Sequence, residues 1–287
     1  MDEDQVIADH RAAGRTFEAA EVQSFVREDG EGASVVCMHG VPSSSFLYRK
    51  VLPALAARGL RGVAFDLPGL GLASRPEEFD YSWTGLGAFA AAAIDALGLD
   101  RFHLVVHDIG GPVGFELAAG MPERIESMTV LNTLVDVASF KKPLSMRPFE
   151  SPTLGPVYLK SLTRPAFRLL MRMQGIADMS AMPQAELDAY VGLLKRDDGG
   201  RAFLRIMQSF ETTPEKQVLY RSTLADVPYP VQVVWGDRDS ALKVDTFGEA
   251  ARRAAGADTI HRLPAKHFLQ EDQADAVAEL IAAFVSS

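Results

Sequence analysis

One short stretch constrains the fold of this chain more than any other. The apolar run at residues 104–106 leads into His107 and Asp108, and two glycines follow at positions 110 and 111. Residues 112–119 then have the composition of a helix. This order predicts a strand, a sharp turn and a helix, with a carboxylate at the apex of the turn. Ligands of parallel sheets bind at such strand ends, so Asp108 is a candidate functional residue.

Strands and helices alternate along most of the chain. We expect strands at residues 16–20, 22–27, 34–38, 62–66, 102–106, 125–132, 231–235 and 259–263. We expect helices at residues 43–57, 84–97, 245–255 and 271–284. This alternation predicts an α/β fold with a mostly parallel central sheet, flanked by helices and joined by right-handed crossovers.

The alternation stops between two of these strands. From residue 134 to residue 221 we expect no strand, and the segment carries helical stretches rich in Pro, Met, Arg and Phe. The sequence therefore predicts an α/β core domain formed by residues 1–133 and 222–287, with a helical cap domain inserted at 134–221.

Composition narrows the range of partners. The net charge of −9 argues against nucleic acid or an anionic membrane, because both require a basic face. The one cysteine, Cys37, lies in an expected strand and cannot form an internal disulfide. The acidic N-terminus lacks the pattern of a secretory signal, and no apolar run is long enough to span a bilayer, so we expect a cytoplasmic protein. We find neither a dinucleotide fingerprint nor metal-ligand spacing, so we expect no cofactor and no metal; the oligomeric state stays open.

Three titratable residues follow separate expected strands in the order Asp108, Asp239, His267. Nucleophile, acid and then histidine is the order of the catalytic residues in α/β-hydrolases. Asn132 ends a further strand, and because an amide cannot be the acid of such a triad, this favours Asp239 in that role.

Five segments carry a resemblance to a known family. They are HGVPSSSFLYR at residues 39–49, DLPGLG at 66–71, HDIGG at 107–111, WGDRD at 235–239 and HFLQED at 267–272. From about residue 34 to the C-terminus, the chain resembles the haloalkane dehalogenase and epoxide hydrolase group of the α/β-hydrolase superfamily, which uses an aspartate nucleophile.

The resemblance implies a reaction with a small apolar organic substrate and water. Asp108 would attack an sp³ carbon to form a covalent alkyl ester, and His267, polarised by Asp239, would activate the water that hydrolyses it. The resemblance places an oxyanion hole at the backbone N–H groups of Val41 and Ile109. Near the site, we expect structural roles for His39, Gly40, His107 and Asn132.

Two departures from the family bear on the leaving group. The dehalogenases bind the departing halide through a Trp directly after the nucleophile and often an Asn after His-Gly, where this chain has Ile109 and Val41. Neither side chain donates a hydrogen bond, which argues against dehalogenation.

Epoxide hydrolases require cap tyrosines to protonate the opening oxygen. Tyr158 and Tyr190 are the candidate donors, while the family's second tyrosine falls near Met207. We also expect Met171, Met173, Met179 and Met182 to line the roof of an apolar pocket. Epoxide opening is therefore favoured, with haloalkane dehalogenation as the alternative; a lactone or ester hydrolase and a non-catalytic small-molecule binding module stay open.

Overall fold

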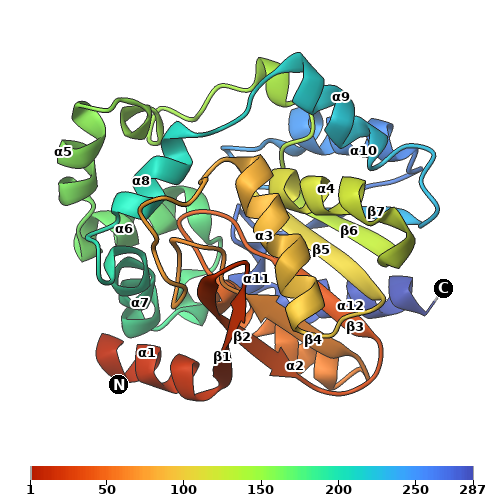
Figure 1. Ribbon diagram of the computed structural model, residues 1–287, viewed down its shortest axis with the longest axis horizontal. Helices are drawn as coiled ribbons and strands as arrows, with labels where there is room; N and C mark the ends of the chain where they lie inside the picture. Colours follow the sequence, from red (N-terminus) through yellow and green to blue (C-terminus); the bar gives the residue numbers. More distant parts are fainter. Residues whose placement is uncertain (1, 287) are drawn as a thin grey trace.

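A computed structural model describes residues 2–286. Its centre is an eight-stranded sheet in the order β1-β2-β4-β3-β5-β6-β7-β8 (Figure 1). The strands are β1 (Gly14–Ala19), β2 (Val22–Asp29), β3 (Ser34–Met38), β4 (Arg61–Phe65), β5 (Phe102–Asp108), β6 (Ile125–Thr133), β7 (Val231–Gly236) and β8 (His261–Leu263). Strand β2 pairs antiparallel with β1 and β4, and all other pairs are parallel. The predicted α/β fold with a mostly parallel sheet is confirmed.

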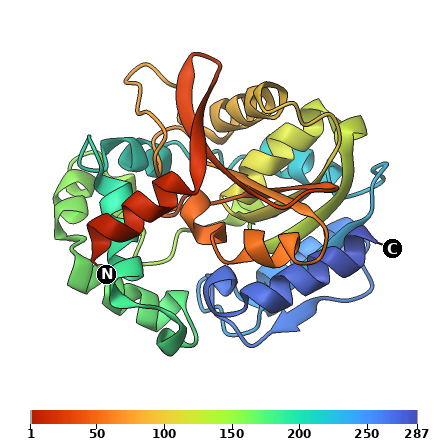
Figure 2. The same ribbon diagram turned by 90° about the horizontal axis from the view of Figure 1, so that it is seen from below.

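Helices cover both faces of this sheet (Figure 2). One face carries α2 (Val51–Ala56) and α12 (Ala274–Val285), and the other carries α3 (Trp83–Ala96), α4 (Gly110–Gly120) and α10 (Glu249–Ala255). The alternation of side chains along β3 explains the two layers, since Val35 and Cys37 pack on the α2 side and Val36 and Met38 on the α3 side.

The sequence did not predict the helix α1 (Glu3–Ala12). This helix buries only Val6 and His10, so it has no apolar stripe that a periodicity search would detect. The side chain of Asp2 caps it by accepting a hydrogen bond from the N–H of Gln5 at 2.9 Å. The expected helix at residues 43–57 is also divided, into a 3-10 turn at residues 45–48 and α2.

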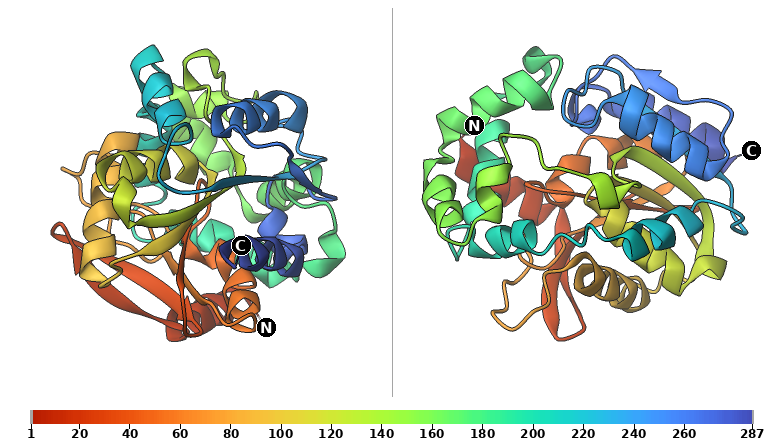
Figure 3. Two further views of the ribbon diagram at one scale, coloured as in Figure 1. Left: turned by 90° about the vertical axis from the view of Figure 1, so that its right-hand side faces the viewer. Right: turned by 90° about the horizontal axis from the view of Figure 1, so that it is seen from above.

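The chain between β6 and β7 is helical, and we call residues 134–221 the inserted segment. Its α-helices are α5 (Leu154–Ser161), α6 (Arg164–Leu170), α7 (Gln184–Lys195), α8 (Arg201–Gln208) and α9 (Pro214–Ser222), the last of which runs one residue past the segment. Helices α5 to α8 gather at one side of the molecule, whereas α9 lies beside α4 (Figure 3). The division into two domains stays a prediction.

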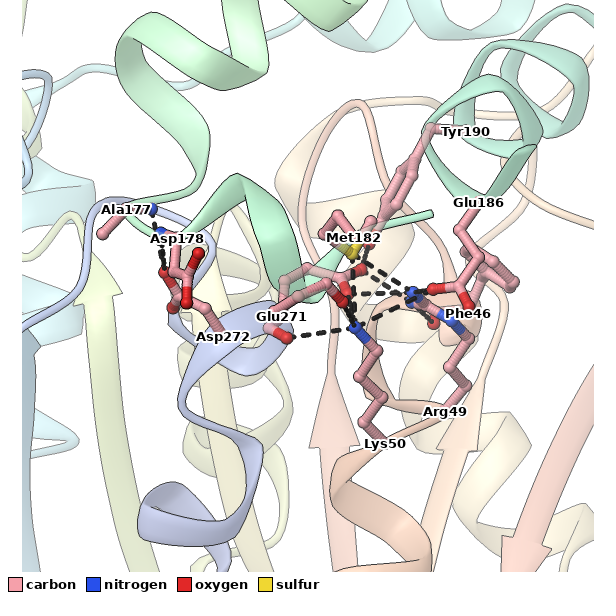
Figure 4. Close-up of polar contacts among 11 residues, drawn as sticks. Phe46, Arg49, Lys50, Ala177, Asp178, Met182, Glu186, Tyr190, Glu271 and Asp272 are labelled. Atoms are coloured by element: carbon pink, nitrogen blue, oxygen red, sulfur yellow. Dashed lines mark hydrogen bonds and ion pairs between the residues drawn. The ribbon is translucent and has the colours of Figure 1, made fainter. Parts of the chain in front are cut away.

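A buried ionic cluster fastens the inserted segment to the sheet (Figure 4). Arg49 donates from Nη1 to Oε1 of Glu271 at 2.6 Å and from Nη2 to Oε2 at 2.9 Å, and it also binds Glu186 of α7. The hydroxyl of Tyr190, also on α7, donates to the same Glu271 carboxylate. Glu271 belongs to the short helix α11 (Leu269–Asp272), which directly follows His267. One carboxylate therefore joins the core, the inserted segment and the loop that carries His267.

Within residues 2–286, no helix combines the length and the apolar character needed to cross a membrane.

Candidate active site

The backbone at Asp108 forms a strained turn between β5 and α4. The φ angle of Asp108 is +54°, in the left-handed region that residues other than glycine rarely adopt. Two glycines leave the room that this turn needs. A Cβ at Gly40 would overlap the Asp108 side chain, and a Cβ at Gly111 would overlap Thr133. The Asp108 carboxylate is thus held at the carboxyl end of the sheet.

The structure brings Asp108, Asp239 and His267 together from three separate strand ends. His267 Nε2 lies 3.3 Å from Oδ2 of Asp108, and His267 Nδ1 lies 2.8 Å from Oδ2 of Asp239. The second Asp239 oxygen accepts hydrogen bonds from the N–H groups of Ala241 and Leu242 at 2.8 and 2.9 Å. Every oxygen of this buried Asp239 carboxylate therefore has a partner, as a charge in that position requires.

The charges of these groups are strongly coupled. Burial alone would lower the pKa of His267, but the charge of Asp239 and the hydrogen bonds to both carboxylates raise it from about 6.5 to about 10. Burial would raise the pKa of Asp108, but His267 and the N–H of Ile109 outweigh it and hold that pKa below its ordinary value. At neutral pH the free protein therefore holds an imidazolium between two carboxylates.

Backbone N–H groups point at Asp108 from two loops. Val41 donates its N–H to Oδ1 of Asp108 at 2.8 Å, and the backbone N–H of Ile109 helps to lower the pKa of the same carboxyl. His39 accepts the N–H of Leu67 at Nε2 (3.0 Å), which leaves Nδ1 to donate to the carbonyl oxygen of Gly40 at 2.9 Å. The buried His39 thus holds the loop that presents Val41.

Two further polar residues hold the neighbours of Asp108. Nε2 of His107 lies 2.8 Å from the carbonyl oxygen of His267, and burial lowers the pKa of His107 to about 4, so the ring is a neutral donor. Asn132 donates from Nδ2 to Asp239 at 2.8 Å and accepts the N–H of Gly236 at 2.9 Å. These contacts orient the loops around His267 and Asp239.

An apolar cavity of about 90 Å³ lies over Asp108 and His267. Its apolar walls include Phe140, Met146, Phe167, Met171, Met207 and Phe210. Of the methionines expected in the roof, Met171 lines this cavity, whereas Met173 is 62% exposed and Met182 contacts Arg49 and Lys50 through its sulfur.

The two candidate tyrosine donors do not line this cavity. Tyr158 donates its hydroxyl hydrogen to the carbonyl oxygen of Ser145 at 3.1 Å, and Tyr190 donates to Glu271. Tyr220 likewise donates to Oε1 of Glu116 at 2.9 Å. The geometry therefore gives no support to Tyr158 or Tyr190 as proton donors above Asp108, because internal acceptors already bind their hydroxyls.

The sequence pattern did not single out two polar residues that do line the cavity, Lys142 and Gln174. Lys142 lies in an irregular part of the inserted segment, and Gln174 lies in the π-helical turn Met171–Gly175, where the ordinary helical period of 3.6 residues does not indicate the direction of a side chain. Among residues 2–286, no group of three or more His, Cys, Asp or Glu side chains is arranged to hold a metal ion.

Residues 33–274 match the family model of the alpha/beta hydrolase fold, and the chain belongs to that family. It is 28% identical over 271 residues to haloalkane dehalogenase 2 of Mycobacterium tuberculosis, covering 93% of each chain. Its fold is similar to those of a haloalkane dehalogenase from Bradyrhizobium elkani (TM-score 0.80, 20% identity, covering 95% of this chain and 97% of the other) and an epoxide hydrolase from Vigna radiata (TM-score 0.75, 22% identity, with the same coverages). The resemblance expected from the motifs is confirmed, and solved structures of both kinds of enzyme share the fold.

Proposed function

We propose that this protein is a hydrolase that acts at an sp³ carbon of a small apolar substrate through a covalent ester on Asp108. The observation that carries the proposal is the arrangement of the Asp108 carboxylate at a strained turn, beneath an apolar cavity and 3.3 Å from an imidazole that is bonded to a second carboxylate. A carboxylate with a lowered pKa is ionised at neutral pH and needs no base to activate it.

In the first step, an oxygen of Asp108 forms a bond to the substrate carbon. The bond from that carbon to its leaving group breaks, and the leaving group keeps the electron pair. The product is a neutral alkyl ester. Because the negative charge beside Nε2 of His267 is lost, the pKa of His267 falls. The imidazolium then releases its proton to the alkoxide of an opened epoxide, or to solvent when the leaving group is a halide.

In the second step, neutral His267 accepts a proton from water, and the oxygen of that water attacks the Asp108 carboxyl carbon. The negative charge then develops on the oxygen that faces the N–H groups of Val41 and Ile109, where two donors stabilise it. Collapse releases an alcohol and restores the Asp108 carboxylate beside the imidazolium. The chain needs no cofactor for either step.

We place epoxides first among the substrates. The alkoxide of an opened epoxide requires one proton, and the imidazolium of the free protein carries one that must leave before the second step. An alkyl halide is the second candidate, favoured by the similarity to a haloalkane dehalogenase. The side chains of Val41 and Ile109 line the cavity without offering a donor to a halide.

Isotope labelling of a single turnover tests the covalent step. With protein in excess over styrene oxide in H₂¹⁸O, the diol of the single turnover should contain ¹⁶O from Asp108. With styrene oxide in excess, the diol of later turnovers should contain ¹⁸O. Diol formation measured beside bromide release from 1-bromobutane then ranks the two substrate classes. Incorporation of ¹⁸O in the first turnover would show direct attack by water and would contradict the proposal.

A further inference from the structure

An anion must depart into a cavity that is almost entirely apolar. A halide or alkoxide without hydrogen bonds in such surroundings is strongly destabilised. Among the described residues that line the cavity, four have polar side chains: Asp108, Lys142, Gln174 and His267. Asp108 is the attacking group and His267 is engaged with two carboxylates, so Lys142 and Gln174 are the remaining side-chain donors.

The backbone of Gln174 is bonded to the loop that carries His267. Gln174 lies in the π-helical turn Met171–Gly175, and its carbonyl oxygen accepts the N–H of His267 at 3.4 Å. The next carbonyl, of Gly175, accepts the N–H of Phe268 at 2.8 Å. Short π-helical turns of this kind occur frequently at functional sites. Gln174 is therefore positioned relative to His267 by direct backbone contacts.

The amide of Gln174 has one end bound and one end free. Its Oε1 accepts a hydrogen bond from Ser145 Oγ at 3.2 Å. Within residues 2–286, its Nε2 donates to no protein acceptor. An amide that is oriented through its oxygen, on the wall of the cavity, offers its N–H groups to a bound molecule.

Lys142 stands where this cavity adjoins a second, polar hollow. The hollow is lined by Glu150, Gln208 and Thr212, and it shares Lys142 with the apolar cavity. Nζ of Lys142 lies 3.0 Å from Oε1 of Glu150 and 4.0 Å from the centre of the Phe210 ring, and the residue is only 8% exposed. One carboxylate and one aromatic face hold the ammonium group in place and leave donor capacity for a third partner.

We propose that the Gln174 amide and the Lys142 ammonium group together form the leaving-group site, which binds the halide or the epoxide oxygen as negative charge develops on it. This inference rests on the proposed function. It names hydrogen-bond donors for the leaving group, which the side chains of Ile109 and Val41 and the tyrosines do not supply. The two donors act by hydrogen bonding. In the unsubstituted protein the alkoxide of an opened epoxide takes its proton from the His267 imidazolium, and in His267→Gln it takes that proton from solvent.

The test measures how fast the Asp108 ester forms in a protein that cannot hydrolyse it. The parent variant is His267→Gln, and the comparison variants add Gln174→Leu or Lys142→Met. The substrates are 1-iodobutane, 1-bromobutane, 1-chlorobutane and styrene oxide, and mass spectrometry follows the adduct. Lys160→Met is the matched control, because Lys160 is an exposed lysine of the inserted segment that does not line the cavity.

A leaving-group site predicts losses that depend on the leaving group. Each variant should form the ester about 100-fold more slowly with the chloride and the epoxide, which need the most stabilisation, and about threefold more slowly with the iodide. Lys142→Arg, which keeps the charge, should recover most of the rate, and Lys160→Met should match the His267→Gln parent.

Equal losses with all four substrates, or no loss, would overturn the leaving-group site while the adduct itself upholds the proposed function. Absence of an adduct in His267→Gln with all four substrates would instead overturn the proposed function, and the leaving-group site with it. Thermal unfolding of each variant separates these results from simple misfolding.

Discussion

At the scale of single residues, Asp108 is held by contacts from several elements. Its backbone is strained, its Oδ1 accepts the Val41 N–H, and its Oδ2 lies beside His267. Gly40 packs so closely that no side chain fits between it and the carboxylate. The position of the Asp108 carboxylate therefore depends on a residue that takes no part in the proposed chemistry.

Gly40→Ala should displace the Asp108 carboxylate, because the added methyl group would occupy the same space. Misplacement of a reacting group by about 1 Å costs about 100-fold in rate, and we expect a loss of at least that size in diol or alcohol formation. Gly120→Ala is the matched control, since a methyl group there meets nothing within 4 Å. Full activity of Gly40→Ala would show that the carboxylate is not confined as described.

The raised pKa of His267 makes stability depend on pH in a defined direction. A histidine whose pKa is about 10 when folded and about 6.5 when unfolded stabilises the protein fully below pH 6.5. This contribution is lost as the pH rises from about 6.5 to about 10. Urea unfolding at pH 6 and pH 10 should show that His267→Gln is less stable than the unsubstituted protein mainly at pH 6. A difference that is equal or larger at pH 10 would contradict the imidazolium assignment.

The sequence was sufficient to locate Asp108, Asp239 and His267, because each follows a strand and the ends of parallel strands converge at one edge of a sheet. It was not sufficient to identify the cavity donors. Whether Tyr158 or Lys142 points toward Asp108 depends on how irregular loops and helices pack above the sheet. The periodicity of the local sequence does not predict this packing.

At the scale of elements, the inserted segment and the His267 loop share one support. The short helix α11 carries Glu271, which binds Arg49, and Asp272, which accepts the N–H groups of Ala177 and Asp178 at 2.8 and 2.9 Å. Both carboxylates follow His267 within five residues (Figure 4). The inserted segment and the loop that carries His267 are therefore anchored to the same short helix.

Arg49→Lys should weaken this support, because an ammonium group cannot reproduce the two parallel hydrogen bonds to the buried Glu271. We expect a loss of about 1–3 kcal/mol in the free energy of unfolding, measured with urea. Arg58→Lys serves as the control: its partner Asp275 is 81% exposed, so the loss should stay within about 0.5 kcal/mol. Equal effects of the two substitutions would argue against the special role of Glu271.

The tyrosines of the inserted segment provide a separate test at this scale. Tyr158→Phe should retain activity within about twofold, because its hydroxyl binds Ser145 and lies outside the cavity. Tyr190→Phe should destabilise the fold by about 1–3 kcal/mol by removing a donor from Glu271. Product assays and urea unfolding of both variants check this. A tenfold or greater loss of activity in Tyr158→Phe, with stability unchanged, would restore the tyrosine as a proton donor.

Element prediction succeeded where the pattern was strong and failed where it was weak. The strands were found within a few residues because buried parallel strands appear as apolar runs, as in β3 and β5. Helix α1 was missed because its contacts with α7 and β1 are formed by few apolar side chains. Its stability comes from tertiary packing that a local pattern does not contain.

At the scale of the whole molecule, the core does not stop at the boundary of the inserted segment. Phe203 and Leu159 belong to the same apolar cluster as the sheet residues Val36 and Val106. Phe167 packs in the cluster on the opposite face of the sheet. The cavity over Asp108 is therefore enclosed by both the core and the inserted segment. Both parts of the chain determine which molecules fit into it.

Family membership extends over nearly the whole chain, yet it does not choose between epoxides and alkyl halides. A haloalkane dehalogenase and an epoxide hydrolase share this fold at similar TM-scores. Function in such a fold is decided by the residues of the site. The polar side chains that line the cavity over Asp108, Lys142 and Gln174 among them, therefore bear on the leaving group more than the sheet does.

The central claim is that Asp108 becomes covalently bound to the substrate, and trapping tests it most directly. His267→Gln should still form the ester but should hydrolyse it at least about 100-fold more slowly. After incubation with styrene oxide or 1-bromobutane, mass spectrometry should find one added substrate mass, or one butyl group, on the peptide that contains Asp108. Asp108→Asn in the same background should show none. An unmodified Asp108 peptide with both substrates, from folded His267→Gln protein, would contradict the account.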